Sequence, residues 1–215
     1  MKKLNYLTCI ILFALTMVSC NNSTSVSPTT AVEVAAADTP KGKYALKSGI
    51  VVYNTQMMGM DVKQTLYFDD YGTKEAQEVS MEMMGVKMHQ VTISKDGFIY
   101  TLDMEQKTGT KVAAPTGLAQ NIDFQNLSEE MAKDMELKKL GTEEFLGKTC
   151  DKMSIDYKKM SMKGTFLVYK GVALKSETDM GSMKMNLVAE KFDENPSIPS
   201  EKFEIPDDIK IMESK

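Results

Sequence analysis

The sequence predicts a mainly β (α+β) fold, in which a curved antiparallel sheet, or incomplete β-barrel, is covered by one or more helices. Two observations lead to this prediction. Short segments rich in β-branched and aromatic residues recur from Tyr44 onward, separated by turn signals such as 94-SKDG-97. One helix-like segment interrupts the series, and no regular alternation of strands and helices indicates a parallel sheet.

The first half of the domain contains six strand-like segments by this criterion. They are residues 47–55, 62–68, 75–82, 88–93, 98–104 and 110–115. Alternation places Leu66 and Phe68 on one face of their segment. The segment 75–82 is polar on both faces, which predicts an edge strand.

A helix is predicted over 126–140, where Ser128 is a suitable N-cap and Glu129 and Glu130 suit a helix N-terminus. Leu127, Met131 and Met135 then share one face. Strands resume with the alternation of Met153 and Ile155, and continue over 164–169, 171–177 and 182–192. The Pro-punctuated segment 194–206 closes the domain. The prediction is therefore about ten strands and at least one helix.

The N-terminus predicts export and a lipid anchor. Lys2 and Lys3 precede the uncharged apolar run 4–18, which is too short to span a bilayer and typical of a signal peptide over residues 1–19. The sequence 17-MVSC-20 resembles a bacterial lipobox, which implies lipid attachment at Cys20. Residues 20–40 then form the lipidated cysteine and a flexible tether, and residues 41–215 a single β domain.

The composition excludes some function classes. The chain has no arginine, and loss of Lys2 and Lys3 takes its net charge from −4 to −6. An acidic chain without arginine is a poor candidate for nucleic-acid binding. No residues form an enzymatic motif, so we expect a non-enzymatic protein with no cofactor. We expect Cys150 to be a small buried hydrophobe and His89, the only histidine, to be structural or exposed.

The order of segments resembles a known superfamily. A strand meander, a central helix, 169-YKGVALKSE-177 and the closing 202-KFEIP-206 together resemble the LolA/LolB-like outer-membrane lipoprotein-sorting superfamily and its small bacterial lipoproteins. The resemblance covers residues 44–212. It implies a LolA-like half-barrel whose concave apolar face holds acyl chains or similar ligands. The chain departs from the superfamily in having no arginine and in beginning with a strand near Tyr44.

These observations predict a lipid-anchored protein of the cell envelope that binds an acyl chain or another hydrophobic ligand. With Asn21 after the cysteine, we expect it in the outer membrane, facing the periplasm. Its predicted partners are the membrane and a hydrophobic ligand. The expected ligand-binding residues are Leu66, Phe68, Phe98, Tyr100, Leu102, Met104, Met153, Ile155, Met183, Met185 and Leu187.

Methionine is the compositional anomaly, with 19 residues in the chain. A Met-x-Met spacing recurs at Met58/Met60, Met81/Met83, Met160/Met162 and Met183/Met185. Three interpretations stay open: core filling, an adaptable apolar surface for lipid tails, and a thioether site for Cu(I). The last makes a Met-rich periplasmic Cu(I)-binding protein the alternative function. An envelope scaffold is a further alternative.

Overall fold

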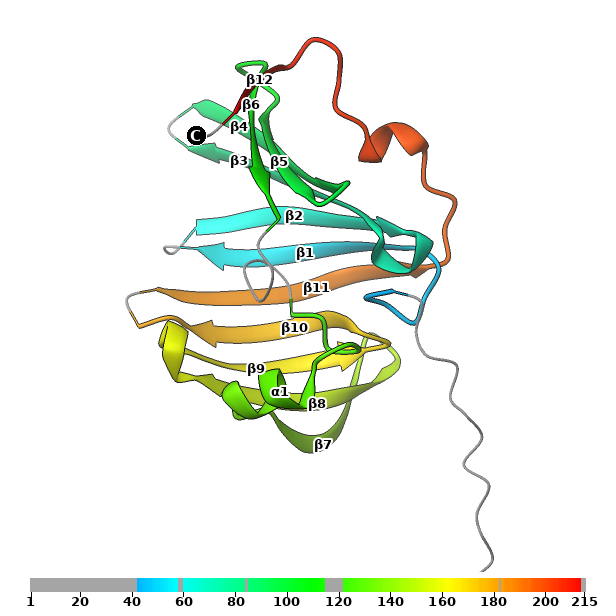
Figure 1. The fold of residues 1–215 in the computed structure, drawn as a ribbon, viewed down its shortest axis with the longest axis vertical. Helices are drawn as coiled ribbons and strands as arrows, with labels where there is room; N and C mark the ends of the chain where they lie inside the picture. The colour runs from blue at the N-terminus through cyan, green and yellow to red at the C-terminus, as the bar shows by residue number, and fades with distance from the viewer. Residues whose placement is uncertain (1–41, 58–59, 84, 115–121, 182, 214–215) are drawn as a thin grey trace, which may run out of the picture. The chain divides into compact units, whose positions relative to one another are not determined.

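The structure of this chain is a computed structural model that describes residues 42–57, 60–83, 85–114, 122–181 and 183–213. The predicted signal peptide, the anchor Cys20, the tether and Met58 lie outside the described residues. All described residues belong to one unit. They form one open, curved sheet of twelve strands with little helix (Figure 1). No helix in the described part of the chain is long and apolar enough to cross a membrane.

The first six strands are β1 (Gly49–Met57), β2 (Met60–Asp69), β3 (Lys74–Met83), β4 (Val86–Lys95), β5 (Phe98–Asp103) and β6 (Thr108–Ala113). The helix α1 (Glu129–Asp134) separates them from the second series. That series is β7 (Lys138–Phe145), β8 (Lys148–Tyr157), β9 (Met162–Tyr169), β10 (Val172–Asp179), β11 (Lys184–Glu194) and β12 (Lys210–Glu213). A 3₁₀ turn, η2 (Lys158–Met160), joins β8 to β9, and η3 (Ser200–Phe203) precedes β12.

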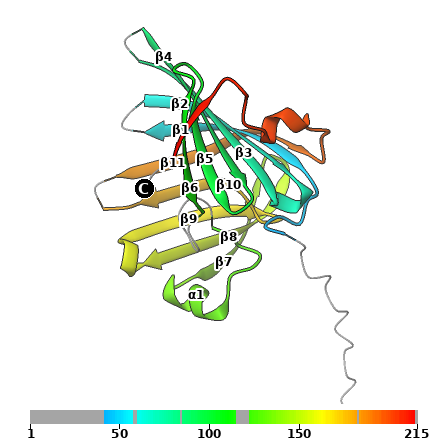
Figure 2. The same ribbon diagram turned by 45° about the horizontal axis from the view of Figure 1, so that its top comes forward.

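Two meanders meet in the middle of this sheet. The strand order is β12-β6-β5-β4-β3-β2-β1-β11-β10-β9-β8-β7, so the pairing of β1 with β11 joins the two series. Figure 2 shows how strongly β4–β6 are turned relative to β1 and β11. All pairings are antiparallel except that of β12 with β6, which is parallel. The predicted curved antiparallel sheet is confirmed with that one exception.

Turn residues support the hairpins of the sheet. Asp96 and Gly97, between β4 and β5, have φ of 53° and 77°. A tight two-residue hairpin of the common type requires positive φ at both of its central residues. The turn signal 94-SKDG-97 therefore marks a hairpin, as the sequence predicts.

The prediction that 75–82 is an edge strand is wrong. β3 lies between β2 and β4, and the edges are β7 and β12. The strand is polar because its carboxylates bind lysines from the segment before β1 and from η3. Glu75 accepts hydrogen bonds from Lys43 Nζ (2.8 Å) and from the Tyr44 hydroxyl, and Glu78 accepts one from Lys202 Nζ (2.7 Å).

The helix is shorter than the predicted 126–140. Ser128 is the N-cap as predicted, and its hydroxyl accepts a hydrogen bond from the backbone N–H of Met131 (3.1 Å). The helix ends at Asp134 because Glu136 takes a left-handed conformation (φ 46°), and Lys138 already begins β7. The buried Met135 fixes this end, since its carbonyl accepts a hydrogen bond from Asp156 N in β8 (2.8 Å).

The strand register assigns side chains to two faces. We call the face covered by α1 (Figure 1) the inner face. Met153 and Phe166, which pair across β8 and β9, pack there with Met135. The same face carries the paired residues Val51 and Leu66. The opposite face, which we call the outer face, carries the paired residues Ile93 and Ala76, and Leu102 and Val91.

Three buried clusters make up the core. The first extends from β1 and β2 to β8–β11 and includes Tyr44 and Leu46 of the N-terminal segment. The second lies on the outer face of β3–β6, where Phe203 and Ile209 of the C-terminal segment cover it. The third lies on the inner face of β8 and β9 beneath Met135. The core therefore changes faces across one continuous sheet, and each part has its own covering segment.

Candidate functional site

A row of cross-strand neighbours runs over the inner face from one side of the sheet towards the other. The pairings are Met153 with Phe166, Phe166 with Ser176, Ser176 with Leu187, Leu187 with Thr55, and Thr55 with Val62. On β3 and β4 the paired Met81 and Met88 continue it. Directly opposed side chains in such pairs are in contact. The row is therefore an apolar band that crosses eight strands with two hydroxyl residues in it.

Burial changes along this row. Met153 and Phe166 are buried under the segment that contains α1. Leu187 and Met81 are half-buried, Thr55 and Val62 between them are buried, and Met88 is 48% exposed. The apolar band is thus only partly covered around Leu187 and reaches solvent at β4. Contiguous apolar surface that is only part covered is characteristic of ligand-binding grooves.

Thr55 is the unusual member of the band. Its side chain is 3% exposed, and Oγ1 has no hydrogen-bond partner among the described residues. Its cross-strand neighbours on the inner face, Leu187 and Val62, are both apolar. A buried hydroxyl without a partner costs about 1–3 kcal/mol. The adjacent Asn54 does not relieve it, because Asn54 lies on the other face of β1 and its amide donates to Glu190 (3.4 Å).

The structure divides the predicted ligand-binding residues between the two faces. The inner face carries Leu66, Phe68, Met153, Ile155, Met185 and Leu187. The outer face carries Phe98, Tyr100 and Leu102, and Met104 packs with them beneath the C-terminal segment. Met183 lies in the β10–β11 hairpin. Period-two alternation shows that one face of a strand is buried, but it does not show on which side of the sheet that face lies. The sequence therefore predicts a single site for residues that the structure places on opposite faces.

Some inner-face positions are filled by the chain itself. Phe68 is fully buried, and the Tyr44 ring lies against it with ring centroids 4.2 Å apart. Burial and the neighbouring Glu75 raise the pKa of the Tyr44 hydroxyl well above its ordinary value. Leu66 belongs to the same cluster. The part of the band available to a ligand is therefore the one around Leu187, away from this N-terminal segment.

The described members of the four Met-x-Met pairs lie at one end of the sheet, at the connections β1–β2, β3–β4, β8–β9 and β10–β11 (left in Figure 1). Met160 does not share a face with Met162, because it belongs to η2, where it is 52% exposed. The sequence pattern missed Met180, which follows the last residue of β10 in the same region. Spacing along one strand cannot reveal a neighbour on the next strand.

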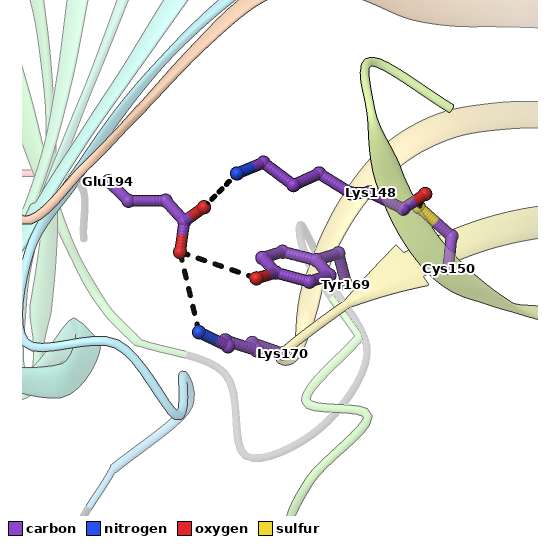
Figure 3. Close-up of polar contacts among 5 residues, drawn as sticks. All are labelled: Lys148, Cys150, Tyr169, Lys170 and Glu194. Atoms are coloured by element: carbon purple, nitrogen blue, oxygen red, sulfur yellow. Dashed lines mark hydrogen bonds and ion pairs between the residues drawn. The ribbon is translucent and has the colours of Figure 1, made fainter. Parts of the chain in front are cut away.

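A polar group closes the opposite end of the second series (Figure 3). Glu194 accepts hydrogen bonds from Lys148 Nζ, from Lys170 Nζ (3.4 Å) and from the Tyr169 hydroxyl (3.4 Å). The hydrogen bond from Lys148 lowers the pKa of Glu194, and burial acts in the opposite direction. This arrangement joins β8, β9 and β11, with two lysines sharing one carboxylate.

Cys150 and His89 take the structural places expected of them. The Cys150 thiol is buried and donates weakly to the Lys148 carbonyl (3.6 Å). Burial, with the nearby Glu144 carboxylate, raises the pKa of this thiol, which disfavours the reactive thiolate. His89 is half-buried and pairs with Ser80 on the outer face. The two side chains belong to different halves of the sheet, on β8 and β4.

A separate cavity of about 200 Å³ lies on the outer face of β7–β10. Its lining includes Glu143, Lys152, Lys175 and Glu177. These charges pair with each other: Lys152 with Glu143 (2.8 Å), and Lys175 with Glu177 (3.4 Å). A cavity lined by satisfied ion pairs is less suited to an apolar ligand than the inner-face band.

Comparison with known proteins gives matches only among structures. No protein-family model matches the chain, and no curated protein matches its sequence. The fold is similar to that of an uncharacterized conserved protein from Thermus thermophilus, with a TM-score of 0.55 and 8% identity over 79% of this chain and 92% of that chain.

Two further solved structures are similar at lower TM-scores. One is the complex of MucA and MucB from Pseudomonas aeruginosa, with a TM-score of 0.49 and 10% identity over 77% of this chain and 58% of that chain. The other is a domain assigned to outer membrane lipoprotein sorting from Vibrio parahaemolyticus, with a TM-score of 0.36 and 9% identity over 76% and 90%. At such identities the likeness concerns the fold alone.

Proposed function

We propose that this protein binds an acyl chain or a similar hydrophobic ligand on the inner face of its sheet, and that it is not an enzyme. The observation that carries the proposal is the apolar band with the buried, unpartnered Thr55 hydroxyl within it. An apolar surface with one convergent polar group is the usual composition of a small-molecule site.

The dimensions of the band suit a long acyl chain. Strands lie about 4.8 Å apart, so the stretch from β9 to β3 spans roughly 24 Å. Each methylene group removed from water contributes about 0.8 kcal/mol. The Thr55 hydroxyl lies on β1, within this stretch, and would hydrogen-bond an oxygen of the ligand's carboxyl or ester group there.

Binding requires the cover of the inner face to adjust. The segment that carries α1 contributes half-buried apolar residues, among them Phe124, Leu127 and Met131. The helix has only six residues and is capped by a single side chain, Ser128. A short helix gains its stability from packing rather than from its own hydrogen bonds. A ligand that takes its place must supply apolar contacts equivalent to those of the Phe124 ring, whose centroid lies 5.2 Å from that of Phe166.

We further propose that the protein acts in the cell envelope, anchored through lipid on Cys20 in the outer membrane and facing the periplasm. The apolar run, the lipobox-like 17-MVSC-20 and the polar segment after it support this. Mass spectrometry of the protein extracted from membranes should show a diacylglyceryl-modified Cys20. A Cys20→Ala variant that still partitions into the membrane fraction would contradict the anchor.

Titration with a fluorescent fatty acid and its displacement by palmitate test the ligand proposal. We expect saturable binding to the wild-type chain, and weaker binding by about tenfold after Leu187→Gln, which places an amide in the apolar band. Val188→Gln is the matched control, because Val188 is equally half-buried but pairs with Lys175 on the outer face. The absence of saturable binding, or equal loss in both variants, would refute the site.

A further inference from the structure

The hairpin between β10 and β11 brings methionines of two strands together on the inner face. Met180 N donates to the Met183 carbonyl (2.9 Å), so these two residues face each other across the turn. One step further into the sheet, Thr178 pairs with Met185. Thr178 and Met185 share their face with the paired Ser176 and Leu187, and alternation puts Met180 and Met183 there too.

A third methionine comes from β9. Gly164 pairs with Thr178, and Lys163 with Asp179, so Met162 lies next to Met180 in the continuing register. Directly opposed residues in antiparallel strands have Cβ atoms about 5 Å apart. Met162, Met180 and Met183 thus occupy three adjacent positions in one row, and Met185 follows Met183 on the same face. All four side chains are half-buried, which leaves them accessible.

The surroundings keep charge away from these thioethers. The residues behind Met162 and Met180 are Gly164 and Thr178, and the Phe166 ring fills the space beside Gly164, so the flexible methionine side chains gather at the hairpin end. The charged residues of the same strand ends, Lys163, Asp179 and Lys184, alternate onto the other face, and Lys184 pairs with Asp179 (3.7 Å). A neutral cluster of soft sulfur donors results.

Thioether sulfur selects soft cations, and Cu(I) is the biological example. Harder donors do not compete for this place: no group of three or more His, Cys, Asp or Glu side chains among the described residues could hold a metal ion. A monovalent ion bound by neutral sulfur ligands keeps a single positive charge, which a half-buried site tolerates better than a divalent charge.

We propose that Met162, Met180 and Met183 bind one Cu(I) ion, with Met185 placed as a fourth sulfur ligand. The site is independent of acyl-chain binding, since it lies at the hairpin end of β9–β11 and uses sulfur rather than apolar area. The site differs in two ways from the Met-x-Met pairs that the sequence pattern predicts. It contains Met180 but not Met160, and its ligands come from the ends of three neighbouring strands instead of one Met-x-Met segment.

The test is competition for Cu(I) with a chromogenic chelator under anaerobic, reducing conditions, repeated with Ag(I) as a redox-stable probe. The full chain is used with Cys9 and Cys20 replaced by Ala in every sample, so that these thiols do not bind the metal. We expect one ion per chain with a dissociation constant below about 1 µM. Failure of the wild-type chain to take up either ion would overturn the proposal.

The variant Met162→Leu, Met180→Leu, Met183→Leu removes the sulfur atoms and keeps apolar volume, so the fold is expected to survive. It should weaken Cu(I) binding by about 100-fold or more. The control replaces Met160 and Met212, which are exposed and lie outside the inner-face band, with Leu and should bind as the wild type does. Equal binding by the two variants would refute the site. Fatty-acid binding, measured on the same samples, should be unchanged and reports separately on the inner-face band.

Discussion

The inner face of β8–β11 and the outer face of β3–β6 are both apolar and both covered, yet their covers are built differently. The C-terminal segment is held on the outer face by buried Phe203 and Ile209, by the β12–β6 pairing and by Lys202 bound to Glu78. The cover of the inner face is held by the buried Met135, whose carbonyl accepts a hydrogen bond from Asp156 N, and by the Phe124 ring against Phe166. The outer cover thus adds a strand to the sheet, whereas the inner cover adds none and is held mainly by side-chain packing.

The outer and inner faces also differ in how completely their side chains are buried. On the outer face Leu102 is fully buried and Ile93 is 1% exposed. On the inner face the band leads from buried Phe166 to half-buried Leu187, and it contains a hydroxyl without a partner among the described residues. The outer face has the properties of a structural core. The inner face combines apolar surface, incomplete cover and an unsatisfied polar group, which is what a ligand would complete.

The largest expected effect is a difference in stability loss between a substitution in the outer-face core and one in the inner-face band. Leu102→Ala should lower the free energy of unfolding by about 2–5 kcal/mol, because it leaves a cavity in a fully packed cluster. Leu187→Ala should cost roughly 1 kcal/mol, since Leu187 is half-buried, while it weakens ligand binding. Urea denaturation monitored by circular dichroism measures both. Equal destabilisation by the two substitutions would remove the contrast between the faces.

Thr55→Val changes a hydroxyl to a methyl group of similar shape. In the ligand-free protein it should raise the free energy of unfolding by roughly 1–3 kcal/mol, because it removes an unpartnered buried polar group. It should also weaken binding of a fatty acid, whose carboxyl group loses a hydrogen-bond donor. Thermal unfolding and the fatty-acid titration report the two effects. A destabilised variant would mean that the hydroxyl has a partner in the ligand-free protein.

Ser128→Ala removes the cap of α1 and should lower stability by about 1 kcal/mol. The effect is expected to be local, with faster amide hydrogen exchange in residues 129–135 and unchanged exchange in β3–β6. If the helix must move aside for the ligand, the association rate should rise. A stopped-flow experiment with a fluorescent fatty acid measures that rate, and a slower association would argue against displacement of this cover.

The smallest effect concerns acid stability. The pKa of Glu194 is lowered in the folded chain by Lys148, so its stabilising contribution is present above the ordinary glutamate pKa near 4.3 and is lost as pH falls through the lowered value. Glu194→Gln should therefore flatten the fall in unfolding temperature below about pH 4. Thermal unfolding between about pH 3 and pH 7 measures it, and Glu190→Gln, an exposed glutamate on the same strand, serves as the control. Parallel pH profiles of Glu194→Gln and the wild type would contradict this account.

Much of the fold was predictable, because period-two alternation and turn residues locate the strands. The six strands before α1 and the N-cap Ser128 follow from these local signals. Three features did not: the interior position of β3, the early end of α1, and the parallel β12. Each depends on a contact between residues far apart in the sequence. The polar β3 lies inside the sheet because Glu75 binds Lys43, and α1 ends early because the Met135 carbonyl accepts a hydrogen bond from Asp156 N. The strand β12 forms by pairing with β6.

The apolar chemistry of the candidate site was predictable from the sequence, but only some of the residues that form the site were. Apolar alternation identified Leu187 and Met153, which lie in the band, together with Tyr100 and Leu102, which lie on the outer face. A strand pattern gives two faces without fixing their sides. Thr55 and Met180 were missed because their significance depends on their cross-strand neighbours, which no local spacing encodes.

Hydrogen exchange measured by mass spectrometry, with and without a saturating fatty acid, tests whether the ligand binds on the inner face. We expect ligand-dependent protection of the inner-face strands around residues 53–55 and 185–189, and unchanged exchange in the outer-face segment 203–213. Protection confined to the C-terminal segment, or no change anywhere at saturating ligand, would contradict a hydrophobic binding site on the inner face.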